Sequence, residues 1–186
     1  MSLELFMSLT PLPLPRIEIS YPVEGTSLAA FNSKVVGTSV IRADWNDLTR
    51  LLQLPELRGA IAYLLVGYDE ENGLSARVGE AGKPPCRLPD HRRNEDLLFA
   101  EEIFVLANAA FDKSDIVYLQ ERISGLVKQA QRAYLVQGTG PISQPLCASK
   151  RRELDLVLRY GLTLLKAAGC PWLEPARSPR PQANHA

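Results

Sequence analysis

The sequence predicts an α/β (α+β) protein in which a small, mostly antiparallel central sheet is flanked by helices. The chain has 186 residues, of which 46% are hydrophobic and 23% are charged, values typical of one globular domain with peripheral segments. Short runs rich in β-branched residues alternate with turn residues and predict strands. Two longer segments carry apolar residues at helical spacing. Together these patterns exclude a fibrous or wholly disordered chain.

Strands are expected at residues 16–21, 35–41, 60–66, 74–78 and 103–107. The run 60–66 is almost continuously apolar, which is typical of a buried central strand. A polar stretch ending at Gly73 separates this run from the next strand. We therefore expect an antiparallel hairpin at the centre of the sheet.

Helices are expected at residues 44–52, 114–134 and 149–168, and residues 82–89 are expected to form a proline-rich loop. Asp44 is a candidate N-cap for the first helix, and Ser114 or Asp112 for the second. The apolar stripes of the two long helices consist of Ile116, Leu119, Ile123, Leu126, Val127 and Ala130, and of Leu154, Leu158, Leu162 and Leu165.

The composition excludes several classes of function. The chain has 21 basic and 21 acidic residues, so any contact with nucleic acid must come from a local patch. Three dispersed cysteines and two histidines do not supply a four-ligand zinc site, and they favour a reducing, cytoplasmic location. No apolar run approaches the roughly 20 residues of a membrane span, so no membrane partner is expected. Residues 1–15 lack a basic start and contain several prolines, unlike a signal peptide.

The expected organisation has five parts: a flexible N-terminal segment at residues 1–15, an N-terminal β/α extension at 16–57, a central domain at 58–145, a C-terminal helix at 146–173, and a disordered tail at 174–186.

The central segment resembles the GIY-YIG nuclease family, and in particular a bacterial group with an N-terminal extension of similar length. The resemblance rests on an ordered set of short matches: Ile61 to Gly67, Arg77 to Ala81, Arg87 with Leu88 and His91, Tyr118 to Ile123, and Gln137 to Pro141. It covers roughly residues 57–145. It implies a GIY-YIG-like fold and an endonuclease that hydrolyses DNA phosphodiester bonds with Mg²⁺ or Mn²⁺.

The resemblance also implies roles for individual residues. Tyr63 matches the first-motif tyrosine, which helps to activate the attacking water, and Arg87 matches the arginine that steadies the phosphate. His91 matches a frequent site histidine. The second-motif tyrosine is replaced by Arg77, and Gln120 occupies the position of the single metal-binding glutamate. The late asparagine of the family corresponds to Gln137.

Two departures bear on activity. An uncharged amide is a poor ligand for a hard cation, so Gln120 predicts that metal-dependent cleavage is weakened or lost. Helical spacing directs the neighbouring Glu121 toward solvent, where it does not replace the lost carboxylate. Pro89 predicts that the helix carrying the phosphate-binding arginine begins late, near Leu88, with Arg87 at its start.

Each candidate site residue has a second interpretation. Tyr63 could be a packing residue, Arg77 a strand-edge charge and Gln120 a satisfied buried polar group. Lys83, Arg87, Arg92 and Arg93 are the candidate nucleic-acid contacts, but nearby acidic residues also fit a solvated surface of mixed charge. The basic run at residues 150–152 opens a helix, which indicates either an anionic partner or a solvated cap.

Three hypotheses of function therefore remain open from the sequence. The chain is a working or weakened metal-dependent DNA endonuclease, or a catalytically inactive module that binds nucleic acid or a protein partner through the same face. The third is a mainly structural interaction module that uses the N-terminal strands and the C-terminal helix. The sequence does not determine the oligomeric state.

Overall fold

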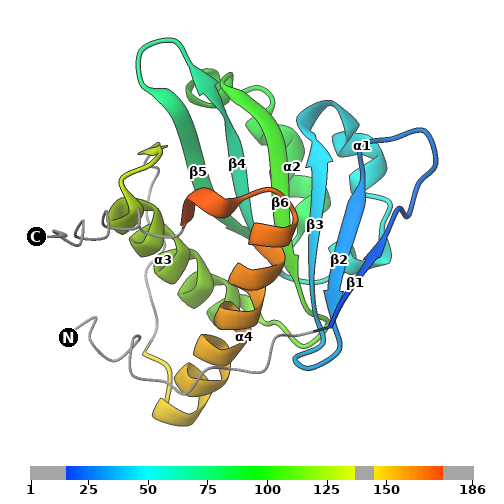
Figure 1. The fold of residues 1–186 in the computed structure, drawn as a ribbon, viewed down its shortest axis with the longest axis vertical. Coiled ribbons are helices and arrows are strands. Elements are labelled where there is room, and N and C mark those ends of the chain that lie inside the picture. The colour runs from blue at the N-terminus through cyan, green and yellow to red at the C-terminus, as the bar shows by residue number, and fades with distance from the viewer. Residues whose placement is uncertain (1–15, 137–144, 174–186) are drawn as a thin grey trace, which may run out of the picture.

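The computed structural model describes residues 16–136 and 145–173, and its centre is one seven-stranded sheet (Figure 1). The strands are β1 (Ile17–Ser20), β2 (Ala29–Ser33), β3 (Thr38–Asp44), β4 (Ile61–Asp69), β5 (Gly73–Ala81), β6 (Ala100–Ala107) and β7 (Tyr134–Leu135). Their order across the sheet is β1-β2-β3-β6-β4-β5-β7. All neighbours are antiparallel except β5 and β7. The expected mostly antiparallel α/β fold is confirmed, although the sheet is larger than the small one predicted.

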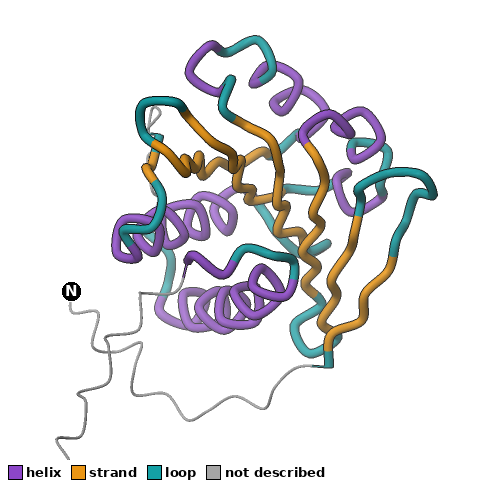
Figure 2. The backbone as a smooth tube through the Cα atoms, turned by 45° about the horizontal axis from the view of Figure 1, so that its top comes forward, coloured by secondary structure: helices purple, strands orange, loops and turns teal. Residues whose placement is uncertain are grey.

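The two long helices, α3 (Lys113–Ala130) and α4 (Ala148–Ala167), cover one face of the sheet (Figure 1). The other face carries α1 (Leu48–Leu51), α2 (Pro84–His91) and 3-10 turns at Trp45–Asp47, Pro55–Arg58 and Glu95–Leu97 (Figure 2). A further 3-10 turn, Pro171–Leu173, follows α4. Side chains alternate along each strand, so the sheet separates two hydrophobic cores.

The N-terminal extension belongs to the same sheet as the predicted central domain. Strand β3 pairs along its length with β6, and β6 pairs with β4 on its other side. Burial explains this arrangement, because Ile41 and Val105 lie opposite each other and both are fully buried. The extension therefore completes the sheet on which the candidate site is built.

Several predicted elements are confirmed. The hairpin of β4 and β5 and the strand β6 lie where the hydrophobic pattern indicates, and α4 matches its predicted range to within one residue. Asp112 caps α3 in a capping box with Asp115, which decides between the two candidate caps. Within the described residues no helix is both long and apolar enough to cross a bilayer.

Other predictions were wrong in position or type. Strand β2 was not predicted, because the sequence Ala-Ala-Phe-Asn-Ser has no β-branched residue. The strand expected at residues 35–41 begins at Thr38, since a tight turn at residues 34–37 joins β2 to β3. Helix α3 ends at Ala130 rather than residue 134, because Gln131 adopts a left-handed conformation and the chain enters β7. Asp44 precedes a 3-10 turn and makes no side-chain cap.

The proline-rich segment 82–89 is not a loop, because residues 84–89 form the first six residues of α2. Pro84 and Pro85 occupy its first turn, where a missing N–H is tolerated, and Pro89 lies in its last turn. Arg87 is consequently the fourth residue of α2, and the expectation that the helix starts near Leu88 was wrong. Gln137, residues 138–144 and the segments 1–15 and 174–186 lie outside the described residues.

Candidate functional site

The centre of the candidate site is a buried pair formed by Tyr63 of β4 and His91, the last residue of α2. The phenol oxygen Oη lies 2.5 Å from the imidazole Nε2, and the two side chains belong to residues only 1% and 6% exposed. Tyr63 belongs to the core between the sheet and α2. The hydrogen bond therefore joins the middle of the sheet to the C-terminal end of α2.

Gly79 provides the space that the Tyr63 ring occupies. It lies directly opposite Tyr63 in the β4–β5 pairing. A Cβ atom at Gly79 would lie 2.2 Å from the ring carbon Cζ and 2.3 Å from Oη. Only a residue without a side chain allows the phenol to cross β5 toward His91.

Two arginines flank this pair. Arg77 precedes Gly79 by two residues in β5 and so faces α2, and its Nη1 donates to the carbonyl oxygen of Val136 at 3.3 Å. Arg87 and His91 are four residues apart on α2, which places them on one side of the helix. Arg87 is exposed, whereas Arg77 is half-buried.

Neither of these arginines forms an ion pair within the described residues. The Nε atom of Arg77 is buried and has no hydrogen-bond partner there. Burial of a guanidinium donor without an acceptor is unfavourable. The Arg77 guanidinium therefore has an unused donor on the α2 side of the sheet, whereas the Arg87 side chain hydrogen-bonds to Tyr63 and forms no ion pair among the described residues.

Burial dominates the ionisation of the central pair. It raises the pKa of Tyr63 to about 12, although the nearby charges of Arg87 and Arg77 act to lower it. Burial also lowers the pKa of His91 to about 4, and the same two arginines reinforce this shift. Burial lowers the pKa of Arg77 from its usual value as well. At neutral pH the phenol is protonated and the imidazole is neutral, so the positive charge of the cluster resides on the arginines.

Gln120 approaches from the other face of the sheet. It lies on α3, and its Nε2 donates to the carbonyl oxygen of Val78 in β5 at 3.3 Å. Its Oε1 is buried without a partner among the described residues. Glu121 is exposed, as its helical position predicts. The structure thus brings Tyr63, Arg77, Arg87 and His91 together and leaves Gln120 across strand β5.

The residues around Tyr63 do not fit a divalent metal ion. The groups that meet there are two guanidinium cations, a protonated phenol and a neutral imidazole, whereas Mg²⁺ is held mainly by carboxylate oxygens. Glu80, the nearest acidic residue along β5, is bound instead to Lys113 at 2.5 Å. Within the described residues no three His, Cys, Asp or Glu side chains gather in a metal-binding cluster.

The predicted basic patch is only partly available for ligands. Arg92 donates a hydrogen bond to the carbonyl of Trp45, and its guanidinium lies 5.6 Å from the Trp45 ring, a cation–π contact that anchors α2. Lys83 and Arg93 are exposed near the two ends of α2. The sequence did not reveal the contact with Trp45, which is 47 residues distant along the chain.

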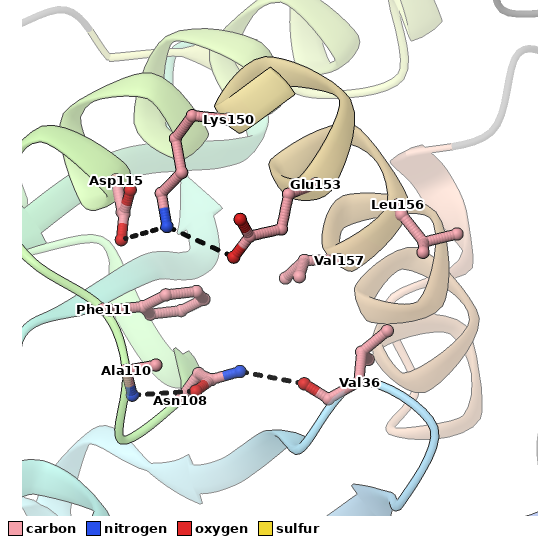
Figure 3. Close-up of a pocket in the computed structure, with 9 residues that line it drawn as sticks. All are labelled: Val36, Asn108, Ala110, Phe111, Asp115, Lys150, Glu153, Leu156 and Val157. Atoms are coloured by element: carbon pink, nitrogen blue, oxygen red, sulfur yellow. Dashed lines mark hydrogen bonds and ion pairs between the residues drawn. The ribbon is translucent and has the colours of Figure 1, made fainter. Parts of the chain in front are cut away.

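A separate cavity of about 250 Å³ lies between the turn before β3, the segment joining β6 to α3, and the first turns of α4 (Figure 3). Its polar wall contains Lys150, whose Nζ lies 3.3 Å from Asp115 and 3.2 Å from Glu153. Phe111 and Leu156 contribute to its apolar wall.

A lysine at the start of α4 is unfavourable for the helix dipole, and these contacts explain why Lys150 is nevertheless found there. Asp115 is 1% exposed and belongs to the α3 capping box. Lys150 neutralises this buried carboxylate and joins the starts of the two long helices. An internal partner, rather than an external anion, accounts for the position of Lys150.

Comparisons with protein-family models, with curated proteins and with solved structures find no match to this chain.

The pKa of His91 predicts a pH-dependent stability. The imidazole of His91 binds a proton near pH 6.5 in the unfolded chain but only near pH 4 in the folded one. The contribution of His91 to the free energy of unfolding is therefore fully present above pH 6.5 and is lost as the pH falls toward 4. We expect the loss at pH 4 to be on the order of 2 kcal/mol. Urea unfolding between pH 7.5 and 4 measures it. His91→Gln removes this contribution, and an identical pH profile for both proteins would contradict the assignment.

The Asp115–Lys150 contact predicts a second stability difference. Lys150→Met leaves the buried carboxylate without its cation, and we expect a loss on the order of 2 kcal/mol in the free energy of unfolding. Lys34→Met is the matched control, because the Lys34–Glu18 pair is exposed and should contribute below about 0.5 kcal/mol. Equal effects of the two substitutions in urea unfolding would show that the internal contact has no special role.

Proposed function

We propose that this chain binds nucleic acid, with DNA as the expected ligand, through a phosphate held by Arg77 and Arg87. We further propose that it is a diverged GIY-YIG-like protein in which metal-dependent cleavage is weak or absent. The observation that carries this proposal is the presence of two guanidinium groups that form no ion pair within the described part of the chain, beside a buried, uncharged Tyr63–His91 pair.

Phosphate is the ligand class that this arrangement favours. A guanidinium is planar and can donate two parallel hydrogen bonds to the oxygens of one phosphate. The buried Nε of Arg77 lacks an acceptor within the described residues, and a phosphate oxygen would provide one. The exposed Arg87 is accessible to an anion arriving from solvent.

The net charge of the chain supports a small contact rather than a long one. Basic and acidic residues are equal in number, so the molecule as a whole does not attract a polyanion. Binding should therefore involve few phosphates and should vary weakly with salt. A slope of about −1 to −2 in the logarithm of affinity against the logarithm of salt concentration corresponds to one or two phosphate contacts.

Weak or absent cleavage follows from the chemistry available at the site. Hydrolysis of a phosphodiester requires an activated water and stabilisation of the charge that develops on phosphoryl oxygens. A pKa of about 12 leaves the Tyr63 phenol protonated at neutral pH, and Tyr63 is only 1% exposed. Gln120 supplies no negative charge for a metal ion.

The comparison with the GIY-YIG pattern suggests how phosphate binding survives these changes. In that pattern one glutamate holds a divalent cation, which gives this part of the site a net charge of +1. In this chain Gln120 is neutral, and Arg77, which replaces a tyrosine on the opposite face of β5, brings one positive charge. We infer that this cation beside Tyr63, rather than a metal ion at position 120, is the positive group that a phosphate meets.

The binding proposal predicts an Arg87-dependent affinity for DNA. In fluorescence anisotropy at low salt, Arg87→Ala should weaken binding of a short labelled DNA about tenfold, because it removes a charge-assisted contact. Arg132→Ala is the control, since Arg132 is an exposed arginine beyond the end of α3. Equal affinities for the wild type and both variants would refute phosphate binding at this site and leave a protein-interaction role.

The cleavage proposal predicts little or no nicking of supercoiled plasmid DNA by the wild-type chain with Mg²⁺ or Mn²⁺. Gln120→Glu tests whether only the carboxylate is lacking, and we expect no restoration because the sheet separates this position from Tyr63. Robust metal-dependent nicking by the wild type that Arg87→Ala abolishes would instead establish an active endonuclease. Binding assays on the same preparations show that each protein is folded and competent.

A further inference from the structure

We propose that the Arg77–Arg87 site recognises the terminal phosphate monoester of a nucleic-acid strand in preference to an internal phosphodiester. This inference rests on the proposed nucleic-acid binding at the same site. Its particular basis is three features of the two guanidinium groups: neither forms an ion pair among the described residues, they differ in burial, and carboxylates lie near them.

The charge of the site matches a monoester. A terminal phosphate carries between about −1.5 and −2 charges at neutral pH and has three free oxygens, whereas an internal phosphodiester carries one charge and has two. Arg77 and Arg87 together supply two positive charges, and neither is in ion-pair contact with a carboxylate within the described residues. Two guanidinium groups can use all three oxygens of a monoester.

The different burial of the two arginines also favours the end of a nucleic-acid strand as the ligand. Arg87 is exposed, Arg77 is half-buried, and the Tyr63–His91 pair near them is buried. An anion that contacts both arginines must enter from the surface inward. A terminal monoester has a single substituent and can enter end-on, whereas an internal phosphate carries a sugar on two of its oxygens.

The surroundings oppose a strand that continues past the site. The charge of Asp90 acts on His91 and the charge of Asp96 acts on Arg77, so both carboxylates lie near the cluster. Glu95 is exposed beside Asp96. Arg92, which could have extended the cationic surface, is bound to Trp45. Further phosphates of a continuous strand would meet these acidic groups together with the exposed Lys83 and Arg93, a surface of mixed charge on which they gain little.

The test compares three versions of one short, labelled DNA strand, carrying a 5′-phosphate, a 3′-phosphate or hydroxyls at both ends. Each is titrated with the full chain in fluorescence anisotropy at low salt. We expect at least one phosphorylated strand to bind about tenfold more tightly than the hydroxyl strand, since it adds one charge-assisted contact.

Arg77→Met should abolish the preference for the phosphorylated end, and Arg132→Met should retain it. Thermal unfolding of the variants checks that Met, which has a similar length, preserves the fold. Equal binding of all strands that still depends on Arg87 would overturn the terminal preference and leave the proposed function intact. Failure of every strand to bind would overturn both. Competition by inorganic phosphate at the affinity of the strand end would indicate a small phosphorylated ligand and would also overturn the inference.

Discussion

The candidate site depends on the contact between the Tyr63 phenol, the backbone at Gly79 and the imidazole of His91. The phenol crosses β5 where no side chain blocks it and meets His91 at 2.5 Å. This contact fixes the position of α2 relative to the central hairpin. Because Arg87 is four residues before His91 on the same helix, the contact also determines where the exposed guanidinium lies.

The sheet divides the charged residues of the molecule into two groups with different roles. On the α2 side, burial keeps the tyrosine and histidine uncharged and leaves two arginines without carboxylate partners in the described residues. On the α3 side, Lys113 pairs with Glu80 and Lys150 pairs with Asp115. Lys113 and Lys150 are therefore paired within the fold, whereas Arg77 and Arg87 form no ion pair among the described residues.

This division gives Gln120 and Arg77 a common interpretation. Gln120 donates to the β5 backbone from the α3 side, and Arg77 extends from the same strand toward α2. A carboxylate at position 120 could not donate to the Val78 carbonyl when ionised. The amide is thus suited to the hydrogen bond that it makes, while the cationic character of the site comes from Arg77.

The sequence by itself determined the elements with strong local patterns. The apolar run of β4, the turn before Gly73 and the stripes of α3 and α4 predicted the central hairpin and the two long helices. These elements depend on residues close together along the chain, where periodicity is informative. Tyr63, Arg87 and His91 were grouped by the resemblance to a family pattern rather than by periodicity, and the structure places the Tyr63 phenol against His91.

Only the tertiary structure decided the rest. The pairing of β3 with β6 joins residues about 60 positions apart, and it made the N-terminal extension part of the central sheet. Packing against the core stabilised α2 despite three prolines, which local propensity alone would oppose. The separation of Gln120 from Tyr63, the anchoring of Arg92 on Trp45 and the burial that shifts the pKa of His91 arise from contacts between distant segments. No local pattern encodes such contacts, because they depend on which faces the folded sheet turns toward its helices.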